Sequence, residues 1–186
     1  MSSEPVLRLA RVDDIPAITA LIDASVRGLS QEHYTADEIE ESLVSVFGVD
    51  SQLIDDGTYF VIECDGELAA SGGWSKRTTL YGGDQVRSAP DPLLDPATDA
   101  ARIRAFYVSP PFARRGLARQ LYQTCEAAAV AAGFRRFQLG ATLPGVPLYE
   151  TLGFHALGPV NTPMRHGLTL GIVHMERAIS PEQAGR

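Results

Sequence analysis

Residues 101–154 read ARIRAFYVSPPFARRGLARQLYQTCEAAAVAAGFRRFQLGATLPGVPLYETLGF, and this stretch decides the fold. The apolar and aromatic segment Arg102–Val108 predicts a buried strand, which Pro110-Pro111 ends because proline has no amide hydrogen for the ladder. From Leu117 onward apolar residues recur every three or four positions, as on one face of a helix, and Gly133 is typical of the position just past a helix end. The stretch therefore predicts a strand, a tight basic loop, a helix, a second strand and a short helix that carries a tyrosine.

The loop between the first strand and the helix has the properties of an anion-binding site. The first amides of a helix have no internal partner and lie at the positive end of the helix dipole. Gly116 has no Cβ, so the backbone can approach a ligand closely, and Ala118 is small. The sequence predicts a cradle for a phosphate or pyrophosphate, formed by Arg114, Arg115, Gly116, Leu117, Ala118 and Arg119.

Two common phosphate-binding patterns, GxxxxGK[ST] and GxGxxG directly after a strand, are absent. The loop instead resembles that of the GNAT superfamily of N-acetyltransferases, whose signature is [Q/R]-x-x-G-x-[G/A] between a central strand and a long helix. Gly116 and Ala118 match its last two fixed positions, whereas Ala113 replaces the first, a lost side-chain bond of at most about 1.5–3 kcal/mol. The segment Leu148–Phe154, LYETLGF, resembles a second feature of the family, a tyrosine followed by a short helix ending in Leu-Gly-Phe. The looser resemblance extends over residues 7–179.

The resemblance implies an α/β fold, a mixed central β-sheet of about seven strands flanked by helices, in one domain over residues 1–186. It implies acetyl-CoA as co-substrate, with its pyrophosphate in the loop and its pantetheine arm paired with the backbone of Phe106, Tyr107 and Val108. It also implies direct attack of an amine on the thioester, without a covalent enzyme intermediate and without a metal. Tyr149 is then the expected general acid, because a phenol with a pKa of ~10 can protonate a thiolate whose thiol has a pKa of ~8.5. Packing beneath the cofactor is the alternative role of Tyr149.

The acceptor side of the predicted site is less determined. A lysine-like amine with a pKa of ~10.4 is only about one part in 10³ neutral at pH 7, so its proton needs an acceptor. Relatives often carry a carboxylate near the fourth strand, but Arg102–Val108 contains none. His33 and Asp84 are the remaining candidates for the base. Trp74, His33 and Tyr81 are the residues expected to line the acceptor pocket.

Two arginines lie on a strand that is expected to be buried. Arg102 and Arg104 alternate on one face, and buried guanidinium groups need partners. We expect them to pair with Asp95 and Asp99 of the preceding loop, and binding of an acidic acceptor is the alternative.

The remaining elements follow from periodicity and turn chemistry. Helices are expected at 13–28, with Asp13-Asp14 as the cap, and at 35–47, where Thr35–Glu38 has the form of a capping box. Asp65-Gly66 indicates a hairpin, and Gly72-Gly73 indicates a bulge or a close backbone approach. Residues 161–167 are expected to form a turn-rich link. The expected strands are 6–11, 58–64, 68–75, 102–108, 137–141, 155–159 and 168–177.

Residues 77–101 form a long loop without regular pattern, rich in proline, glycine and aspartate. Loops of this length are uncommon unless they are functional or disordered. We expect this loop to fold over the acceptor side, and a surface excursion is the alternative.

Composition excludes several classes of protein. The 186 residues suit one domain, and 45% apolar residues are ordinary for a globular protein. A net charge of −7 argues against general nucleic-acid affinity and mildly favours a cationic acceptor such as an amine. No stretch approaches 18 apolar residues and no signal peptide is recognised, so we expect no membrane span and a cytoplasmic location. Cys64 and Cys125 are expected to be small buried residues, and the histidines show no shared metal-ligand spacing.

The function implied by the resemblance is an acetyl-CoA-dependent N-acetyltransferase, with a small-molecule amine as the favoured acceptor. A non-catalytic acyl-CoA sensor is an alternative that the missing base favours. A protein N-acetyltransferase, and a phosphate-binding domain unrelated to coenzyme A, are further alternatives. Many members of the family are dimers, so a homodimer is compatible with the resemblance.

Overall fold

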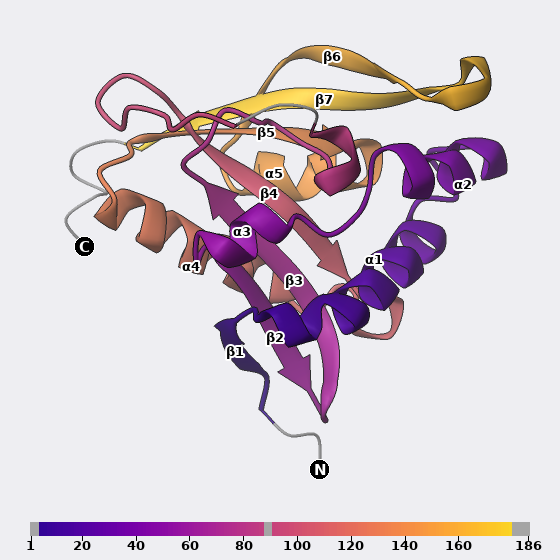
Figure 1. The fold of residues 1–186 in the computed structure, drawn as a ribbon, viewed down its shortest axis with the longest axis horizontal. Coiled ribbons are helices and arrows are strands. Elements are labelled where there is room, and N and C mark those ends of the chain that lie inside the picture. Colours follow the sequence, from indigo (N-terminus) through magenta and orange to yellow (C-terminus); the bar gives the residue numbers. More distant parts are fainter. Residues whose placement is uncertain (1–3, 88–90, 180–186) are drawn as a thin grey trace.

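The computed structural model describes residues 4–87 and 91–179. Within them seven strands form one sheet in the order β1-β2-β3-β4-β5-β7-β6 (Figure 1). The β4–β5 pair is parallel and the other neighbouring pairs are antiparallel, which confirms the expected mixed sheet. The strands are β1 Val6–Leu9, β2 Tyr59–Cys64, β3 Glu67–Ser75, β4 Ala101–Val108, β5 Arg136–Thr142, β6 His155–Pro163 and β7 Thr169–Ala178.

The helices cover both faces of the sheet (Figure 1). One face packs against α1, α2 and α3, and the other against α4 and α5. Strand β2 shows the alternation: Tyr59 and Val61 pack in the cluster of α1, whereas Ile62 packs with Leu121 of α4. The helices are α1 Ile15–Leu29, α2 Ala36–Ser45, α3 Ser51–Asp55, α4 Leu117–Ala131 and α5 Val146–Thr151.

Local sequence signals account for several helix ends. The capping box is confirmed, because the Glu38 amide donates to Thr35 Oγ1 at 3.2 Å and the Thr35 amide donates to Glu38 Oε2 at 2.8 Å. Asp14 precedes α1 but does not cap it through its side chain, since the carboxylate pairs with Arg8 at 2.7 Å. This pairing lowers the pKa of Asp14.

Outside the core stretch one helix was missed and one expectation was wrong. Helix α3 was not expected, because it has little periodic pattern of its own. The segment 161–167 was expected as a turn, but β6 continues to Pro163 and only Arg165–Gly167 forms a turn. Pairing with β7 extends the strand, with Thr162 opposite Leu170.

Strands β4 and β5 separate soon after they begin. Their pairing covers only Ala101 with Phe137 and Arg102 with Gln138, so beyond Arg102 the edge of β4 that faces β5 has no strand partner. Such a separation leaves room for a ligand between the two strands.

A bulge in β4 lies next to this opening. The β3–β4 register shifts between Ser71 and Gly73, so Ala105 and Phe106 together lie opposite Gly72. Ala105 has a left-handed φ of 57°, and a Cβ on Gly72 would lie 2.8 Å from the Phe106 ring. The irregularity expected at Gly72-Gly73 is therefore confirmed, although the extra residue lies in β4. The close backbone approach is at Gly73, where a Cβ would lie 2.7 Å from Thr58 O.

The long loop after β3 crosses the face of the sheet that carries α1. Arg77 and Leu93 form an isolated bridge within it, and Arg102 donates to Thr78 O at 3.3 Å. The Tyr81 ring lies over Gly140 of β5, 3.1 Å from the position of a Cβ there. Residues 88–90 of this loop lie outside the described part. Its described first half thus covers the point where β4 and β5 separate.

The cysteines and histidines of the described residues form no cross-link and no metal cluster. Cys64 and Cys125 are both buried and free. No group of three metal-ligating side chains was found in residues 4–87 and 91–179. In the same ranges no helix has the length and apolar character needed to cross a membrane.

Candidate active site

A cavity of about 850 Å³ lies where β4 and β5 separate. Its walls come from both faces of the sheet. Phe106 and Tyr149 belong to the core on the α4 side, whereas Phe47, Tyr81 and Tyr107 belong to the core on the α1 side. The cavity therefore joins two ends, one on each face.

The cofactor end consists of residues 112–114 and 116–119. Gly116 has a left-handed φ of 82° immediately before α4, and no protein atom lies within 4 Å of where its Cβ would be. The fold thus requires glycine there for its backbone conformation and leaves the space beside it free. Leu117 is buried and begins the helix, so the unpaired first amides of α4 lie at this end of the cavity.

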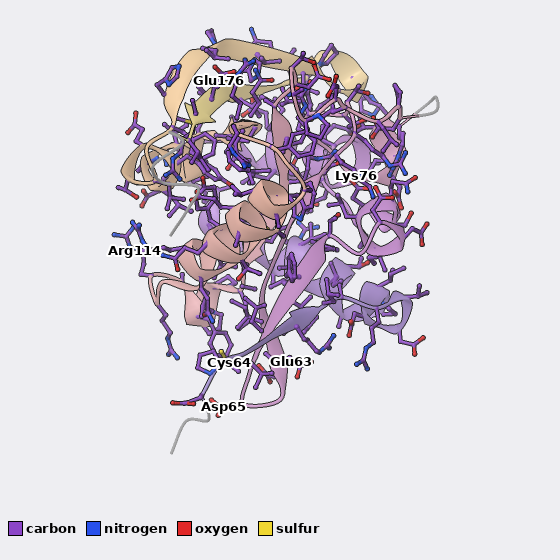
Figure 2. All side chains as sticks on the ribbon, turned by 90° about the vertical axis from the view of Figure 1, so that its left-hand side faces the viewer. Glu63, Cys64, Asp65, Lys76, Arg114 and Glu176 are labelled. Carbon is purple, nitrogen blue, oxygen red and sulfur yellow. The ribbon has the colours of Figure 1, made fainter. Side chains whose placement is uncertain are left out.

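The arginines of the cofactor end differ in position. Arg114 projects from the loop that precedes α4 (Figure 2) and lines the cavity. Arg119 also lines it and donates to Thr151 Oγ1 at 3.2 Å. Arg115 is not part of the lining, because its guanidinium carbon lies over the Phe112 ring, 5.2 Å from the centroid. The structure therefore brings two of the three predicted arginines to the cavity.

The end of β4 forms the middle of the cavity, as predicted for Phe106, Tyr107 and Val108. The Val108 amide donates to Ser25 Oγ of α1 at 3.2 Å. Ser25 is buried and lines the cavity itself. One amide of the strand expected to pair with a cofactor thus has a side-chain partner, which could not be foreseen from local sequence.

Tyr149 lies on α5 and also borders the middle of the cavity. Its ring packs edge-on against Phe106 at 6.3 Å and Phe154 at 5.7 Å between centroids. Burial raises the pKa of Tyr149 above its ordinary value, so the phenol keeps its proton at neutral pH. Within the described residues its hydroxyl has no hydrogen-bond partner, which leaves the proton available to a ligand.

The acceptor end consists of Val26, Leu29, Glu32, His33, Phe47, Leu80, Tyr81, Gly82 and Arg104, and Tyr107 lies where it meets the middle of the cavity. Phe47 packs edge-on against Tyr107 at 6.2 Å, and Tyr81 accepts a hydrogen bond from Thr162 Oγ1 at 2.9 Å. His33 and Tyr81 thus reach the cavity as predicted. Glu32 joins them as the one carboxylate among the described residues of the lining.

A buried ion pair supports the acceptor end. Arg104 donates to Asp50 at 2.8 Å, and both side chains are 3% exposed. The same guanidinium donates to Thr79 O at 2.8 Å and to Gly82 O at 2.5 Å. Asp50 also accepts from Arg87 at 2.7 Å. The long loop is therefore fastened to β4 through Arg104.

The partners expected for the two β4 arginines were wrong. Arg104 pairs with Asp50, whereas Arg102 binds the Gln138 side chain and a loop carbonyl. Asp95 and Asp99 instead stabilise a turn of their own, in which the Asp95 amide donates to Asp99 Oδ2 at 2.7 Å. Local capping satisfies these carboxylates before a distant arginine can.

Two other candidate residues lie away from the cavity. Trp74 is 5% exposed in the core, with its ring 6.0 Å from that of Phe134, so it does not line the acceptor pocket. Its position on β3, paired with β2 and β4, turns it toward the α4 core. Asp84, a candidate base, pairs with Arg87 and accepts from the Ser51 amide at 3.0 Å, also outside the lining.

Several functional residues were missed from the sequence, among them Ser25, Glu32, Phe47 and Asp50. Each lies in an ordinary helix or link and meets the site only through the tertiary fold. Tyr34 illustrates the coupling, because its hydroxyl donates to Gly171 O at 2.7 Å and accepts from the Leu143 amide at 2.9 Å. That single phenol fixes the link between α1 and α2 against the ends of β5 and β7.

Comparison with solved structures supports this architecture. A GCN5-related N-acetyltransferase from Rhodopseudomonas palustris is similar with a TM-score of 0.70 and 18% identity, over 96% of this chain and 98% of that chain. YncA from Salmonella typhimurium, solved with its cofactor acetyl-CoA, has a TM-score of 0.61 and 18% identity, over 96% and 95%. The PaiA N-acetyltransferase of Thermoplasma acidophilum, in complex with coenzyme A, has a TM-score of 0.60 and 10% identity, over 95% and 99%. At these identities the likeness establishes the fold.

The family follows from the sequence itself. A search of curated proteins found no significant match. The sequence profile of the acetyltransferase (GNAT) family, however, matches residues 22–154, which is well over half of the chain. The matched range includes the cradle before α4, the separating strands and Tyr149. The chain therefore belongs to the GNAT family of acetyltransferases.

Proposed function

We propose that this protein transfers the acetyl group of acetyl-CoA to the amine of a small molecule. One observation carries the proposal: a single cavity of about 850 Å³ joins an arginine-lined helix N-terminus, a buried tyrosine and an aromatic pocket. These three parts correspond to an anchor for phosphates, a proton donor and a place for an acceptor.

The cofactor end has the chemistry that coenzyme A requires. The first amides of α4 bind a diphosphate, and Arg114 and Arg119 add positive charge beside it. The space next to Gly116 is free of protein atoms, so a phosphate can approach the backbone. Beyond Arg102, β4 offers an unpaired strand edge for the amides of the pantetheine arm. Bound acetyl-CoA supplies an acetyl group activated as a thioester.

Tyr149 supplies the proton that the departing sulfur takes up. Its raised pKa keeps the hydroxyl in the donor form, and its contacts with Phe106 and Phe154 hold the ring in one orientation. Proton removal from the acceptor falls to His33, the imidazole of the lining, or to water. This replaces Asp84, which is engaged elsewhere.

A small acceptor is favoured over a protein because the long loop covers the acceptor end. Leu80, Tyr81 and Gly82 close it from one side, and Arg104 holds Gly82 in place. A polypeptide substrate needs an open groove, which this cover restricts.

The homodimer and the cytoplasmic location are proposals that rest on the family resemblance and the sequence. Sedimentation velocity of the purified chain tests the first, and fractionation of the producing cell tests the second.

Calorimetric titration with acetyl-CoA tests the cofactor site. We expect micromolar binding by the wild type and loss of binding in Gly116→Glu. Gly66→Glu is a matched control, because Gly66 has a φ of 83° against 82° for Gly116 and neither has a protein atom within 4 Å of its Cβ position. Gly66 lies in the β2–β3 turn directly after Asp65, and Figure 2 shows Asp65 apart from Arg114. Equal loss in both variants would reveal backbone strain rather than a lost cradle, and no binding by the wild type would reject the proposal.

An amine screen with Tyr149→Phe tests the chemistry. We expect turnover to fall by about 10²-fold or more, as for loss of a general acid, with the affinity for acetyl-CoA retained. Tyr122→Phe is the control, because Tyr122 is also buried in the same core but lies outside the cavity lining, where its hydroxyl accepts from Arg177. Tight cofactor binding with no transfer to any amine would favour the sensor. Acetylation of peptides alone would favour a protein acetyltransferase.

A further inference from the structure

We infer that the acceptor is a monoamine with an uncharged aromatic or branched apolar body, bearing no carboxylate or phosphate. The inference rests on the proposed function and specifies the substrate class of the same site. Three features of the acceptor end lead to it. Its walls are aromatic, its buried cation Arg104 is neutralised by an ion pair, and its single carboxylate, Glu32, is exposed.

The walls of the acceptor end are mostly apolar and are held in place. Phe47 and Tyr107 pack edge to face, with ring centroids 6.2 Å apart. Tyr81 is fixed at its hydroxyl by Thr162 and at its ring by Gly140. Val26, Leu29 and Leu80 complete the surface. Fixed aromatic and branched aliphatic walls favour a rigid apolar body over a flexible polar chain.

The cation at this end is already neutralised. Arg104 is the one arginine or lysine among the described residues that line the acceptor end, and it pairs with Asp50 at 2.8 Å. Asp50 is shared with Arg87, which also pairs with Asp84, so two arginines face two aspartates and their formal charges cancel. The guanidinium of Arg104 also donates hydrogen bonds to Thr79 O and Gly82 O.

An acceptor carboxylate therefore meets no uncompensated cation there. It would lose hydration against the aromatic walls without gaining an ion pair, which is costly for any charged group. The other arginines of the lining, Arg114 and Arg119, lie at the cofactor end. This distribution discriminates against amino acids and phosphorylated amines.

Glu32 provides the opposite preference for the amine itself. It is an exposed carboxylate in the lining and forms no ion pair within the described residues, so it can attract an ammonium group to the acceptor end. Because it is exposed, its effect is modest and falls with salt.

The test compares two ligands that differ only by one carboxylate group. 2-Phenylethylamine and L-phenylalanine share the ring, the spacing and the amine, and the second adds a carboxylate. At pH 8, above the range in which histidines ordinarily titrate, we expect kcat/KM for the amine to exceed that for the amino acid by about 100-fold. Calorimetry of each ligand with the coenzyme A complex gives a second readout that needs no turnover, and we expect it to detect only the amine. A preference for phenylalanine, or for the dication 1,4-diaminobutane, would overturn the inference.

Two variants locate the effect. Phe47→Ala should raise KM for 2-phenylethylamine about tenfold and leave the acetyl-CoA affinity unchanged. Glu32→Gln should lower kcat/KM about threefold in low salt, with no difference from wild type in 0.5 M NaCl. Glu67→Gln, an exposed glutamate on β3 outside the lining, is the matched control and should change neither value.

The outcomes separate this inference from the proposed function. Transfer to phenylalanine or to the diamine in preference to phenylethylamine would reject the substrate class while leaving the acetyltransferase intact. Binding of acetyl-CoA with neither amine binding nor transfer would reject both.

Discussion

The two ends of the cavity are built in opposite ways. The cofactor end comes from one short run, residues 112–119, and relies on backbone amides and exposed arginines. The acceptor end collects side chains from α1, its link to α2, Phe47, the long loop and β4, and a buried ion pair fastens it. From this difference we expect substitutions at the cofactor end to change ligand affinity with little effect on the free energy of unfolding. Substitutions at the acceptor end should change both, because the same side-chain contacts build the site and stabilise the fold.

The largest effect is expected where the acceptor end depends on the fold. Asp50→Ala leaves Arg104 buried without its carboxylate, and we expect the free energy of unfolding to fall by about 3–5 kcal/mol. Urea denaturation measures it. Asp84→Ala, which removes the more exposed partner of Arg87 and the acceptor of the Ser51 amide, should cost only about 1–2 kcal/mol. If Asp50→Ala lowered the free energy of unfolding as little as Asp84→Ala, the acceptor end would not depend on the stability of the fold more than the cofactor end does.

The opposite behaviour is expected at the cofactor end. Arg119→Ala should weaken acetyl-CoA binding about tenfold, as for loss of one charge-assisted contact, and leave the melting temperature nearly unchanged. Arg115→Ala is the control, because Arg115 stacks on Phe112 outside the lining and should change affinity less. Equal effects of the two substitutions would show that general charge, and not position at the cavity, determines affinity.

The bulge between the two ends offers a smaller test. Ala105 has a left-handed φ of 57°, which costs a residue with a Cβ about 1 kcal/mol. We therefore expect Ala105→Gly to be stabilising by up to about 1 kcal/mol in urea denaturation, with the cavity unchanged. Destabilisation would show that packing of the Ala105 methyl group outweighs the backbone strain.

The smallest effect concerns the Val108 amide, in the middle of the cavity between the two ends. Ser25→Ala removes the hydroxyl that occupies the Val108 amide, so a cofactor no longer competes for it, and we expect the Kd for acetyl-CoA to fall about threefold. Ser42→Ala is the control, because the Ser42 hydroxyl bonds within α2 and lies outside the lining. Weaker binding by Ser25→Ala would mean that this hydroxyl assists the cofactor.

Sequence reasoning was most successful where interactions are local. The β2–β3 hairpin, the capping box at Thr35 and the start of α4 after Gly116 were all confirmed, because each depends on a few neighbouring residues. The residues of the loop before α4 are also neighbours in the sequence, and their role as a phosphate cradle stays a prediction. The mixed sheet of about seven strands came from the family resemblance, and the order of the strands within it was not predicted, since periodicity carries no information on which strands are neighbours.

It failed where a residue depends on distant partners. Trp74 was expected at the pocket because large aromatic residues often line one, yet its β3 position turns it into the core. Asp50 carried no local sign of its pairing with Arg104, 54 positions away. Pairings of that kind follow from tertiary geometry, and a single sequence contains no signal that indicates them.

The Arg104 cluster has a consequence for the order in which the chain is made. Its protein partners, Asp50, Thr79 and Gly82, all precede Arg104 in the sequence, so each has already been synthesised when Arg104 leaves the ribosome. Arg119, by contrast, must wait for Thr151. Folding during synthesis proceeds from the N-terminal side. The Arg104 contacts that hold the acceptor end can therefore form on the nascent chain before the contact of Arg119 with Thr151 at the cofactor end.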